Sequence, residues 1–331
     1  MHKLRVKEMI QETADARSFV LEPLPAAAER YIYRSGQFLT FRLLIDGQEH
    51  FRSYSMSSSP AVDALPRVTV KRVPGGVVSN WMHESLNVGD TIEATTPSGV
   101  FVLNNSERDV VAFAAGSGIT PVLSILTTAL ATTTLRVRLL YANRDASSII
   151  FRSQLGDAIE RYGDRLDVHF HCDSDAGLIE RATLDRIVDG TAGSEFFVCG
   201  PGTFMDLVED VLSARDIDPA RVHLERFVPE APPGVPAASA DSLEVTIDCG
   251  RRTATGRHHD GSTILQTART MGLQPPSSCQ IGSCGACIAR VVKGRAQMRH
   301  NDALTPEEVE EGWILTCQAY PEGSGVHVAY E

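Results

Sequence analysis

Hydrophobic and polar residues follow two different patterns in successive parts of the chain. The first part contains short strand-like runs separated by Gly, Pro and Asn turns, which predicts a small antiparallel β-barrel. From Asp109 onward, buried-strand runs such as Val110 to Ala114 alternate with helical stretches such as Pro121 to Ala131. That alternation is typical of a doubly wound α/β domain with a parallel sheet. We therefore expect the barrel over residues 1–105 and the α/β domain over 106–228.

A third domain is expected after a stretch rich in Pro and Ala. Residues 229–241 have the composition of a linker and not of a core element, which indicates a semi-rigid tether. Beyond it, Leu243 to Ile247 has the pattern of a strand, Ile264 to Met271 that of a helix, and Gly325 to Ala329 that of a last strand. These mixed elements predict a separate α+β domain over 242–331.

Composition narrows the class of protein. The 331 residues are 43% hydrophobic and 22% charged, and the net charge is -11. Such values are typical of a globular protein and unfavourable for binding nucleic acid. No apolar run is long enough to cross a bilayer, and the first residues have the pattern of a strand and not of a signal peptide. We expect a cytoplasmic protein that binds neither a membrane nor nucleic acid.

Four of the seven cysteines lie close together in the last domain. Cys279-x4-Cys284-x2-Cys287 is followed after a gap by Cys317, which is the spacing of plant-type 2Fe-2S ligands. Glycine and alanine in this loop let the backbone wrap closely around a cluster and direct N–H groups at its sulfides. Zinc is also bound by four thiolates, but the x4 gap and the single distant cysteine fit zinc poorly. We predict that these four thiolates bind a 2Fe-2S cluster.

A second motif lies in the predicted barrel. Arg52-Ser53-Tyr54-Ser55 has the form R-x-Y-S, which resembles the flavin motif of the ferredoxin-NADP reductase superfamily. The resemblance implies that Arg52 binds the flavin pyrophosphate, that the Tyr54 ring packs on the isoalloxazine, and that the Ser55 hydroxyl lies near flavin N5. A guanidinium pairs well with phosphate, and an aromatic face suits a flat heterocycle. We therefore expect all four residues at the flavin, with Tyr54 and Ser55 at the catalytic centre.

A further flavin segment is expected later in the barrel. Val70-Lys71 is followed by Gly76-Val77-Val78-Ser79, which resembles the G-x-x-S segment of the same superfamily. The resemblance implies that backbone N–H groups and the serine hydroxyl bind the pyrophosphate there, and glycine is suited to such close approach. Members with FAD and members with FMN share the R-x-Y-S motif. The position of the cluster domain after the nucleotide domain favours FAD.

The nicotinamide site is expected in the α/β domain. Gly116-Ser117-Gly118-Ile119-Thr120-Pro121 follows a strand and precedes a helix, the context that a dinucleotide-binding turn requires. Its last position is Pro121 and not glycine, which is the form usual in the reductase superfamily. We expect Gly116, Gly118, Thr120 and Pro121 to bind the nucleotide.

Two later segments of this domain also resemble the superfamily. Cys199-Gly200-Pro201 is similar to its C-G-P segment, which implies that nicotinamide enters toward the flavin at Cys199 and that this thiol belongs to the catalytic centre. A small buried residue at a strand end is the ordinary alternative for Cys199. Glu225-Arg226-Phe227 is similar to the acidic-aromatic tail of related reductases, which implies that Phe227 borders the flavin.

The choice between NADH and NADPH is open at the sequence level. Arg144 stands directly before Asp145 at the end of a predicted strand. An acidic side chain there favours a free ribose hydroxyl, whereas an arginine favours a 2′-phosphate. We expect Arg144 to contact the nucleotide. NADH is the donor that the family resemblance implies, with NADPH as the alternative.

Taken together, the motifs cover essentially the whole chain in the order FAD domain, NAD domain, ferredoxin domain. The last domain resembles plant-type ferredoxins, which implies a β-grasp fold. The order resembles the three-domain reductases of multicomponent oxygenases, and the runs Gly36 to Thr40, Asn143 to Asp145 and Asn301 to Leu304 are most similar to the reductases of 3-ketosteroid 9α-hydroxylases.

The resemblance implies that electrons pass from NAD(P)H through FAD and the 2Fe-2S cluster to a terminal Rieske-type oxygenase that acts on a steroid. A diiron partner, as in the epoxidase of phenylacetyl-CoA breakdown, is the alternative. A regulatory protein that only senses through a cluster would leave the flavin and nucleotide motifs without a purpose.

Overall fold

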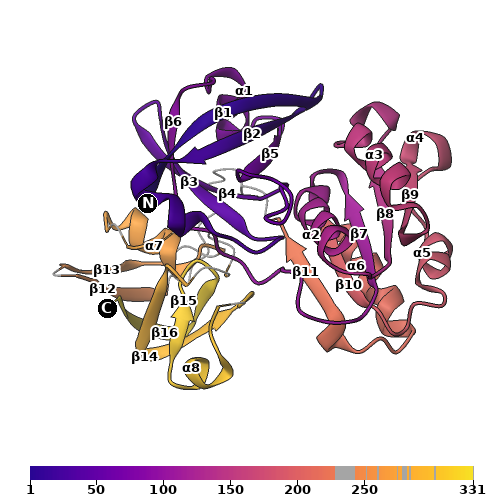
Figure 1. The fold of residues 1–331 in the computed structure, drawn as a ribbon. Coiled ribbons are helices and arrows are strands. Elements are labelled where there is room, and N and C mark those ends of the chain that lie inside the picture. Colours follow the sequence, from indigo (N-terminus) through magenta and orange to yellow (C-terminus); the bar gives the residue numbers. More distant parts are fainter. Residues whose placement is uncertain are drawn as a thin grey trace. The chain divides into compact units, whose positions relative to one another are not determined.

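The computed structural model describes residues 1–227, 243–250, 252–258, 261–273, 275–277, 282, 285–301 and 303–330. The chain forms two compact units, Met1–Phe227 and Val228–Glu331 (Figure 1). The predicted linker over 229–241 lies outside the described residues. Within the part of the chain that is described, no helix has the length and apolar character needed to span a membrane.

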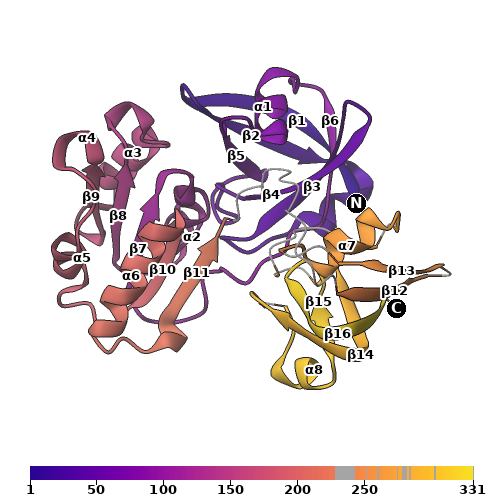
Figure 2. The same ribbon diagram turned by 180° about the vertical axis from the view of Figure 1, so that it is seen from behind.

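The first unit begins with an antiparallel sheet of six strands in the order β4-β3-β6-β1-β2-β5, which Figure 2 shows from behind. The strands are β1 (His2–Thr13), β2 (Ala16–Pro23), β3 (Phe38–Ile45), β4 (Gln48–Ser55), β5 (Arg67–Lys71) and β6 (Thr91–Ala94). A bridge between Met56, just after β4, and Val68 in β5 links the two outer strands and closes the sheet toward a barrel. Alternate residues point inward and form one apolar core, since side chains alternate along a strand. A 3-10 helix (Pro25–Tyr31) and α1 (Val77–Glu84) complete this part.

The second part of the unit is a parallel sheet of five strands in the order β11-β10-β7-β8-β9. The strands are β7 (Val110–Ala115), β8 (Val137–Asn143), β9 (Leu166–Cys172), β10 (Glu195–Gly200) and β11 (Val222–Arg226). The helices are α2 (Ile119–Thr132), α3 (Arg152–Tyr162), α4 (Asp173–Ala176), α5 (Arg181–Val188) and α6 (Gly202–Ala214). One apolar cluster joins the sheet to α2 and α3, and a second joins it to α5 and α6. Every residue of β7 is buried, because helices cover both faces of the sheet.

The barrel and the parallel sheet share a packed interface. Ala16 and Phe101 come from the barrel part of the chain, yet both are buried in the cluster around α2. Ser124 on α2 ties the two parts together, because its hydroxyl donates to the Ser58 carbonyl at 2.5 Å and accepts from the Gly36 N–H at 3.2 Å. Residues from the two halves of this unit can therefore form one site.

The second unit contains a mixed sheet of five strands in the order β13-β12-β16-β14-β15. Its elements are β12 (Glu244–Cys249), β13 (Arg252–Arg257), α7 (Ile264–Thr270), β14 (Ile288–Met298), α8 (Pro306–Glu310), β15 (Trp313–Leu315) and β16 (Ala319–Tyr330). Among the described strands of this unit only β12 and β16 pair in parallel. Apolar residues of α7 pack into the core on the sheet. The expected fold class of the chain, an antiparallel barrel, a parallel nucleotide domain and an α+β ferredoxin domain, is confirmed.

Candidate flavin, nucleotide and cluster sites

The R-x-Y-S residues form the end of β4, next to β3 in the barrel sheet. Register pairs Tyr54 with Leu39 and Ser53 with Thr40 on β3, and the Ser53 and Thr40 hydroxyls share a hydrogen bond of 2.8 Å. Tyr54 packs against the barrel core and lies 6.0 Å, ring to ring, from Phe41. The Arg52 guanidinium donates to the Phe51 carbonyl at 2.6 Å. β4 thus fixes the motif on a rigid strand.

The G-x-x-S segment forms the start of α1. Gly76 is the N-cap residue, and no side chain in the described part of the chain caps this helix. The first N–H groups of a helix have no partner within it and give this end partial positive charge. A Cβ atom on Gly76 would stand 2.8 Å from Ser79 Oγ and 3.0 Å from Val73 Cβ, so glycine keeps the approach open. This cradle fits the pyrophosphate of a flavin dinucleotide.

The predicted residues in and next to this segment, Val70, Lys71, Val77 and Val78, differ in their exposure and contacts. Val70 and Val78 are buried in the barrel core, whereas Val77 is exposed. Lys71 ends β5, and its Nζ lies 3.7 Å from the position that a Cβ atom on Gly116 would occupy. A lysine of the barrel therefore reaches the turn in which the nucleotide motif lies.

The nucleotide motif forms a tight turn between β7 and α2. A 3-10 helix spans Gly116–Gly118, and α2 begins at Ile119. A Cβ atom on Gly118 would stand 2.1 Å from the Cys199 carbonyl oxygen, so only glycine fits between this turn and β10. The Thr120 hydroxyl donates to the Ser117 carbonyl at 3.0 Å. Pro121 falls in the first turn of α2, where its missing N–H breaks no helical hydrogen bond.

Ser55, Cys199 and Glu225 meet where the barrel touches the parallel sheet. The Ser55 hydroxyl donates to Glu225 Oε2 at 2.9 Å, across 170 positions of sequence. Cys199 on β10 lies opposite Glu225 on β11 in the strand register. Burial raises the pKa of the Cys199 thiol well above its ordinary value, and the Glu225 charge raises it further. The thiol is therefore neutral near pH 7, a buried packing group and not a thiolate nucleophile.

The remaining residues predicted around the nicotinamide lie beside this group. Gly200 ends β10 directly after Cys199, and Pro201 is the N-cap residue of α6. Phe227 follows β11 and is 38% exposed, so its ring is accessible at the end of the first unit.

The end of β8 carries a buried amide without a partner. Both polar side-chain atoms of Asn143 are buried and lack a hydrogen-bond partner, a combination not found for other side chains in the described part of the chain. A buried polar group without a partner is unfavourable and often marks the place of a ligand or water. Asn143 lies at the carboxyl edge of the parallel sheet, where nucleotides bind to such folds. The site therefore fits a nicotinamide nucleotide.

The two residues that follow Asn143 make different contacts, Arg144 with another side chain and Asp145 with its own backbone neighbours. The Asp145 carboxylate accepts from the Ser147 and Ser148 N–H groups at 2.9 and 3.0 Å and caps a short 3-10 helix. The hydrogen bond from the Ser147 hydroxyl is the main reason why the pKa of Asp145 lies below its ordinary value. Arg144 instead reaches Asp15 Oδ2 at 3.5 Å. Sequence reasoning missed Asp15, which belongs to no recognisable motif. It included Asn143 only in a run that resembles the family and not among the expected site residues.

Two of the four predicted cluster ligands lie in the described residues, whereas Cys279 and Cys284 do not. Cys287 and Cys317 are buried together with Leu265 and Leu315. Thr316 joins their backbones, because its N–H and its hydroxyl donate to the Cys287 carbonyl at 3.1 and 2.9 Å. Two neighbouring thiols in an apolar setting fit a pair of ligands to a 2Fe-2S cluster.

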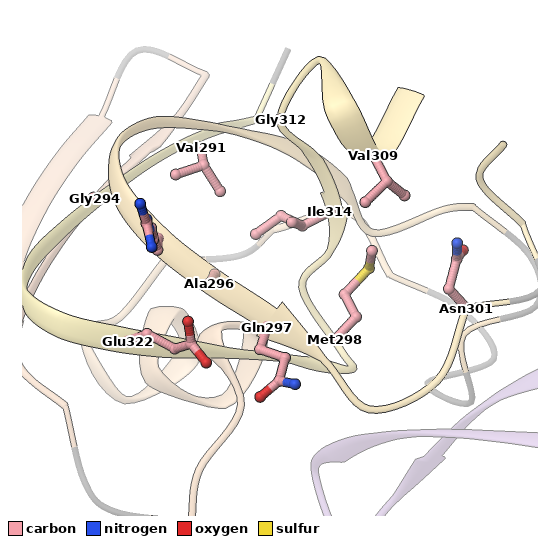
Figure 3. A pocket seen from close by; sticks show the side chains of 11 residues that line it. Val291, Gly294, Ala296, Gln297, Met298, Asn301, Val309, Gly312, Ile314 and Glu322 are labelled. Carbon is pink, nitrogen blue, oxygen red and sulfur yellow. The ribbon is translucent and has the colours of Figure 1, made fainter. Parts of the chain in front are cut away.

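A hollow of about 650 Å³ lies between β14, β15 and α8 in the second unit. The side chains of Met298, Val309 and Ile314 lie next to one another at its wall (Figure 3). Met298 also packs against the apolar group that contains Cys287 and Cys317, and its sulfur accepts from the Leu315 N–H at 3.1 Å. Met298 is thus shared by the wall of the hollow and the apolar group around the two cysteines.

Comparison with known families matches all three parts of the chain. Residues 3–103 match the oxidoreductase FAD-binding domain, residues 113–210 the oxidoreductase NAD-binding domain, and residues 247–322 the 2Fe-2S iron-sulfur cluster binding domain. The chain is therefore an NAD(P)H-dependent oxidoreductase with FAD and a 2Fe-2S cluster as its cofactors.

Individual relatives extend over the whole length. The ferredoxin reductase component of 3-ketosteroid-9-alpha-monooxygenase from Rhodococcus rhodochrous is 39% identical over 96% of this chain and 93% of its own length. A component of 1,2-phenylacetyl-CoA epoxidase from Escherichia coli K12 is 33% identical over 100% of this chain and 98% of its own. The solved structure of phthalate dioxygenase reductase, 22% identical, has the same fold with a TM-score of 0.68 over 99% of this chain and 97% of its own. The chain belongs to the family of FAD- and 2Fe-2S-containing reductase components that serve terminal oxygenases.

Proposed function

We propose that this protein is the reductase component of a 3-ketosteroid 9α-hydroxylase, which transfers electrons from NADH to a Rieske-type terminal oxygenase. The principal support is the 39% identity to such a reductase component across nearly all of both chains. The contact between Ser55 and Glu225, with Cys199 opposite Glu225 in the register, supports a site for hydride transfer between the barrel and the parallel sheet.

The domain limits that we propose follow from the sequence patterns. Residues 1–105 bind FAD, 106–228 bind the nicotinamide nucleotide, 229–241 link the two units, and 242–331 hold the cluster. Bound FAD would supply the conversion between the two electrons of a hydride and the single electrons that a 2Fe-2S cluster takes up.

The protein residues bind and orient these groups. Arg52 and the first turn of α1, from Gly76 to Ser79, would hold the FAD pyrophosphate by charge-assisted hydrogen bonds. Tyr54 would pack against the isoalloxazine ring, Ser53 anchors the strand, and Phe227 would border the ring. The pair of Ser55 and Glu225 fixes the position at which nicotinamide meets the flavin.

The nucleotide is held by the turn over Gly116–Pro121, which Lys71 approaches, and by Asn143 and Arg144 at the end of β8. Cys199, Gly200 and Pro201 shape the nicotinamide pocket. The neutral Cys199 thiol excludes water and introduces no charge beside the nicotinamide, which suits hydride transfer. Cys287 and Cys317, together with Cys279 and Cys284, hold the cluster.

A matched pair of cysteine variants tests the proposed electron path. With Cys317→Ser, we expect NADH still to bleach the flavin band, but the electron paramagnetic resonance signal of the reduced cluster and the reduction of cytochrome c to be lost. Cys249→Ser should behave as the wild type, because Cys249 lies on β12 outside the predicted ligand set. A full cluster signal in Cys317→Ser would refute the assignment.

The partner oxygenase needs a separate test, because a diiron system is the second candidate. The relative from 1,2-phenylacetyl-CoA epoxidase is 33% identical over the whole chain. Reconstitution with a purified Rieske-type steroid hydroxylase and with a diiron phenylacetyl-CoA epoxidase compares the two directly. We expect NADH-dependent turnover at least about tenfold faster with the steroid hydroxylase, a difference of about 1.4 kcal/mol in transition-state free energy. Faster turnover with the epoxidase would overturn the proposal.

A further inference from the structure

Asp15 occupies the tip of the hairpin between β1 and β2 and faces the parallel sheet. Its neighbour Ala16 is fully buried in the apolar cluster around α2, so the tip is packed against the nucleotide-binding part. The Thr13 hydroxyl donates to Asp15 Oδ1 at 2.8 Å, and the Arg72 N–H donates to the Asp15 carbonyl at 2.7 Å. The carboxylate is therefore held in a defined orientation.

The other carboxylate oxygen of Asp15 attracts two cations from different elements. Asp15 Oδ2 lies 3.5 Å from the Arg144 guanidinium and 3.8 Å from Lys71 Nζ. Arg144 is at the end of β8, beside the unpartnered amide of Asn143, and Lys71 reaches toward the turn at Gly116. Both cations thus stand at the edge of the nucleotide site that the fold assigns to this sheet.

The Asp145 carboxylate is held in place by the residues that follow it. Its Oδ1 accepts three hydrogen bonds, from the Ser147 and Ser148 N–H groups and the Ser147 hydroxyl. These bonds leave Oδ2 to accept from the ribose hydroxyls, as an acid at this position does in NADH-dependent proteins of this fold. The charge balance at Arg144 is a second feature that distinguishes a 2′-hydroxyl from a 2′-phosphate.

We propose that Asp15 is a specificity-determining residue that favours NADH over NADPH by competing for Arg144 and Lys71. A 2′-phosphate gains from these cations only if it displaces the Asp15 carboxylate, and it is repelled by that carboxylate if it does not. The neutral 2′-hydroxyl of NADH meets neither obstacle. This inference rests on the proposed reductase function and adds the residue that sets its donor.

The test compares Asp15→Asn with a matched loss of charge elsewhere in the holoprotein. Asparagine retains an oxygen for the Thr13 hydroxyl but removes the charge. We expect the ratio of kcat/KM for NADPH to that for NADH to rise about tenfold, a moderate value because the carboxylate is partly exposed and screened by salt. Glu93→Gln removes a carboxylate that pairs with Arg42 at 3.2 Å on the barrel, and the ratio should stay as in the wild type.

A binding measurement without electron transfer provides a second readout. Titration of the holoprotein with 2′-AMP and with 5′-AMP should show about tenfold tighter binding of 2′-AMP alone in Asp15→Asn, an effect that weakens as salt rises. In an Arg144→Ala background the same substitution should alter 2′-AMP binding by a smaller factor than in the wild type, because one of the two cations for which Asp15 competes is gone.

Two results would overturn the inference, and they are distinguishable from failure of the proposed function. The inference fails if Asp15→Asn changes neither the nucleotide ratio nor 2′-AMP binding more than Glu93→Gln does. It also fails if the change is equally large without Arg144. If neither NADH nor NADPH bleaches the flavin of the wild-type protein, the proposed function fails, and the inference with it.

Discussion

Single side chains at the seam between the barrel and the parallel sheet determine how this reductase can work. Ser55 is buried on β4, and its hydroxyl has Glu225 as its hydrogen-bond acceptor. Cys199 lies opposite Glu225 and keeps its proton because burial and the Glu225 charge raise its pKa. These three side chains are buried and define a site away from the bulk solvent.

At this scale we predict that Ser55→Ala slows flavin reduction more than it affects FAD binding. Without the hydroxyl, Glu225 loses a hydrogen bond that fixes its position, and a misplaced group at the reacting centre lowers the rate about tenfold to hundredfold. Stopped-flow absorbance of the flavin band after mixing with NADH measures the rate, and the flavin absorbance of the purified protein measures FAD content.

Ser57→Ala is the control for loss of a buried hydroxyl. Ser57 shares a hydrogen bond of 2.7 Å with Thr69 in the same barrel, so this variant should lose stability but reduce its flavin at the wild-type rate. Equal rates in Ser55→Ala and Ser57→Ala would show that Ser55 has no special part in hydride transfer.

Individual elements position the site through close backbone contacts. The turn before α2 touches β10 so tightly that a Cβ atom on Gly118 would overlap the Cys199 carbonyl. The nucleotide turn and the strand that carries the thiol are therefore fixed to each other.

We predict that Gly118→Ala separates these two elements and harms both stability and nucleotide binding. A methyl group that must push backbone atoms apart destabilises a packed region by about 1–3 kcal/mol. Thermal unfolding and NAD⁺ titration of the same sample measure the two effects.

Gly156→Ala provides the opposite control. Gly156 lies inside α3, and a Cβ atom there would meet no atom within 4 Å. Alanine should stabilise this helix by about 0.5–1 kcal/mol, because glycine is the poorer helix former. If both alanine variants behaved alike, the close contact at Gly118 would not control the site.

The elements differ in how far the sequence could predict them. The run Val110 to Ala114 is apolar throughout and is correctly predicted as a buried strand. By contrast, α1 was not expected as a helix, because its residues were interpreted only as a flavin-binding segment. β14 has mostly exposed and often charged residues, so it lacks the hydrophobic pattern on which strand prediction depends.

The site shows the same limit for contacts between distant residues. Resemblance to the reductase superfamily predicted the R-x-Y-S, nucleotide-turn and C-G-P segments as site residues, since each is a continuous stretch with its own chemistry. Asp15 carries no such signal, because its contacts with Lys71 and Arg144 exist only once the hairpin packs on the parallel sheet. The sequence likewise could not show that Arg144 pairs with Asp15 while Asp145 caps the short 3-10 helix that follows it.

For the whole molecule, the two compact units have separate cores. The barrel and the parallel sheet share buried residues, namely Ala16 and Phe101 in the cluster around α2. The second unit has apolar clusters of its own, one of which contains Cys287 and Cys317. The two units should therefore differ in what stabilises them.

We predict two thermal transitions, of which only one depends on iron. Cluster binding contributes to folding free energy because the ligands are not assembled in the unfolded chain. Cys317→Ser should lower the midpoint of the second unit's transition by several degrees, about 4–8 °C for each kcal/mol lost in a domain of this size. The midpoint of the first unit's transition, which depends on flavin, should not change. Calorimetry of the wild type and of Cys317→Ser measures both midpoints. A single transition that shifts as a whole would contradict separate stability of the units.

The hydrogen bond from Ser55 to Glu225 also limits how such proteins can be recombined. A chimera that joins the barrel of one relative to the parallel sheet of another could keep every strand and every cofactor motif. It would still lack a working junction unless the donor at position 55, the acceptor at 225 and the packing of Ala16 were inherited as a set. Exchange of parts between family members should therefore succeed most readily when residues 1–227 are transferred as one block.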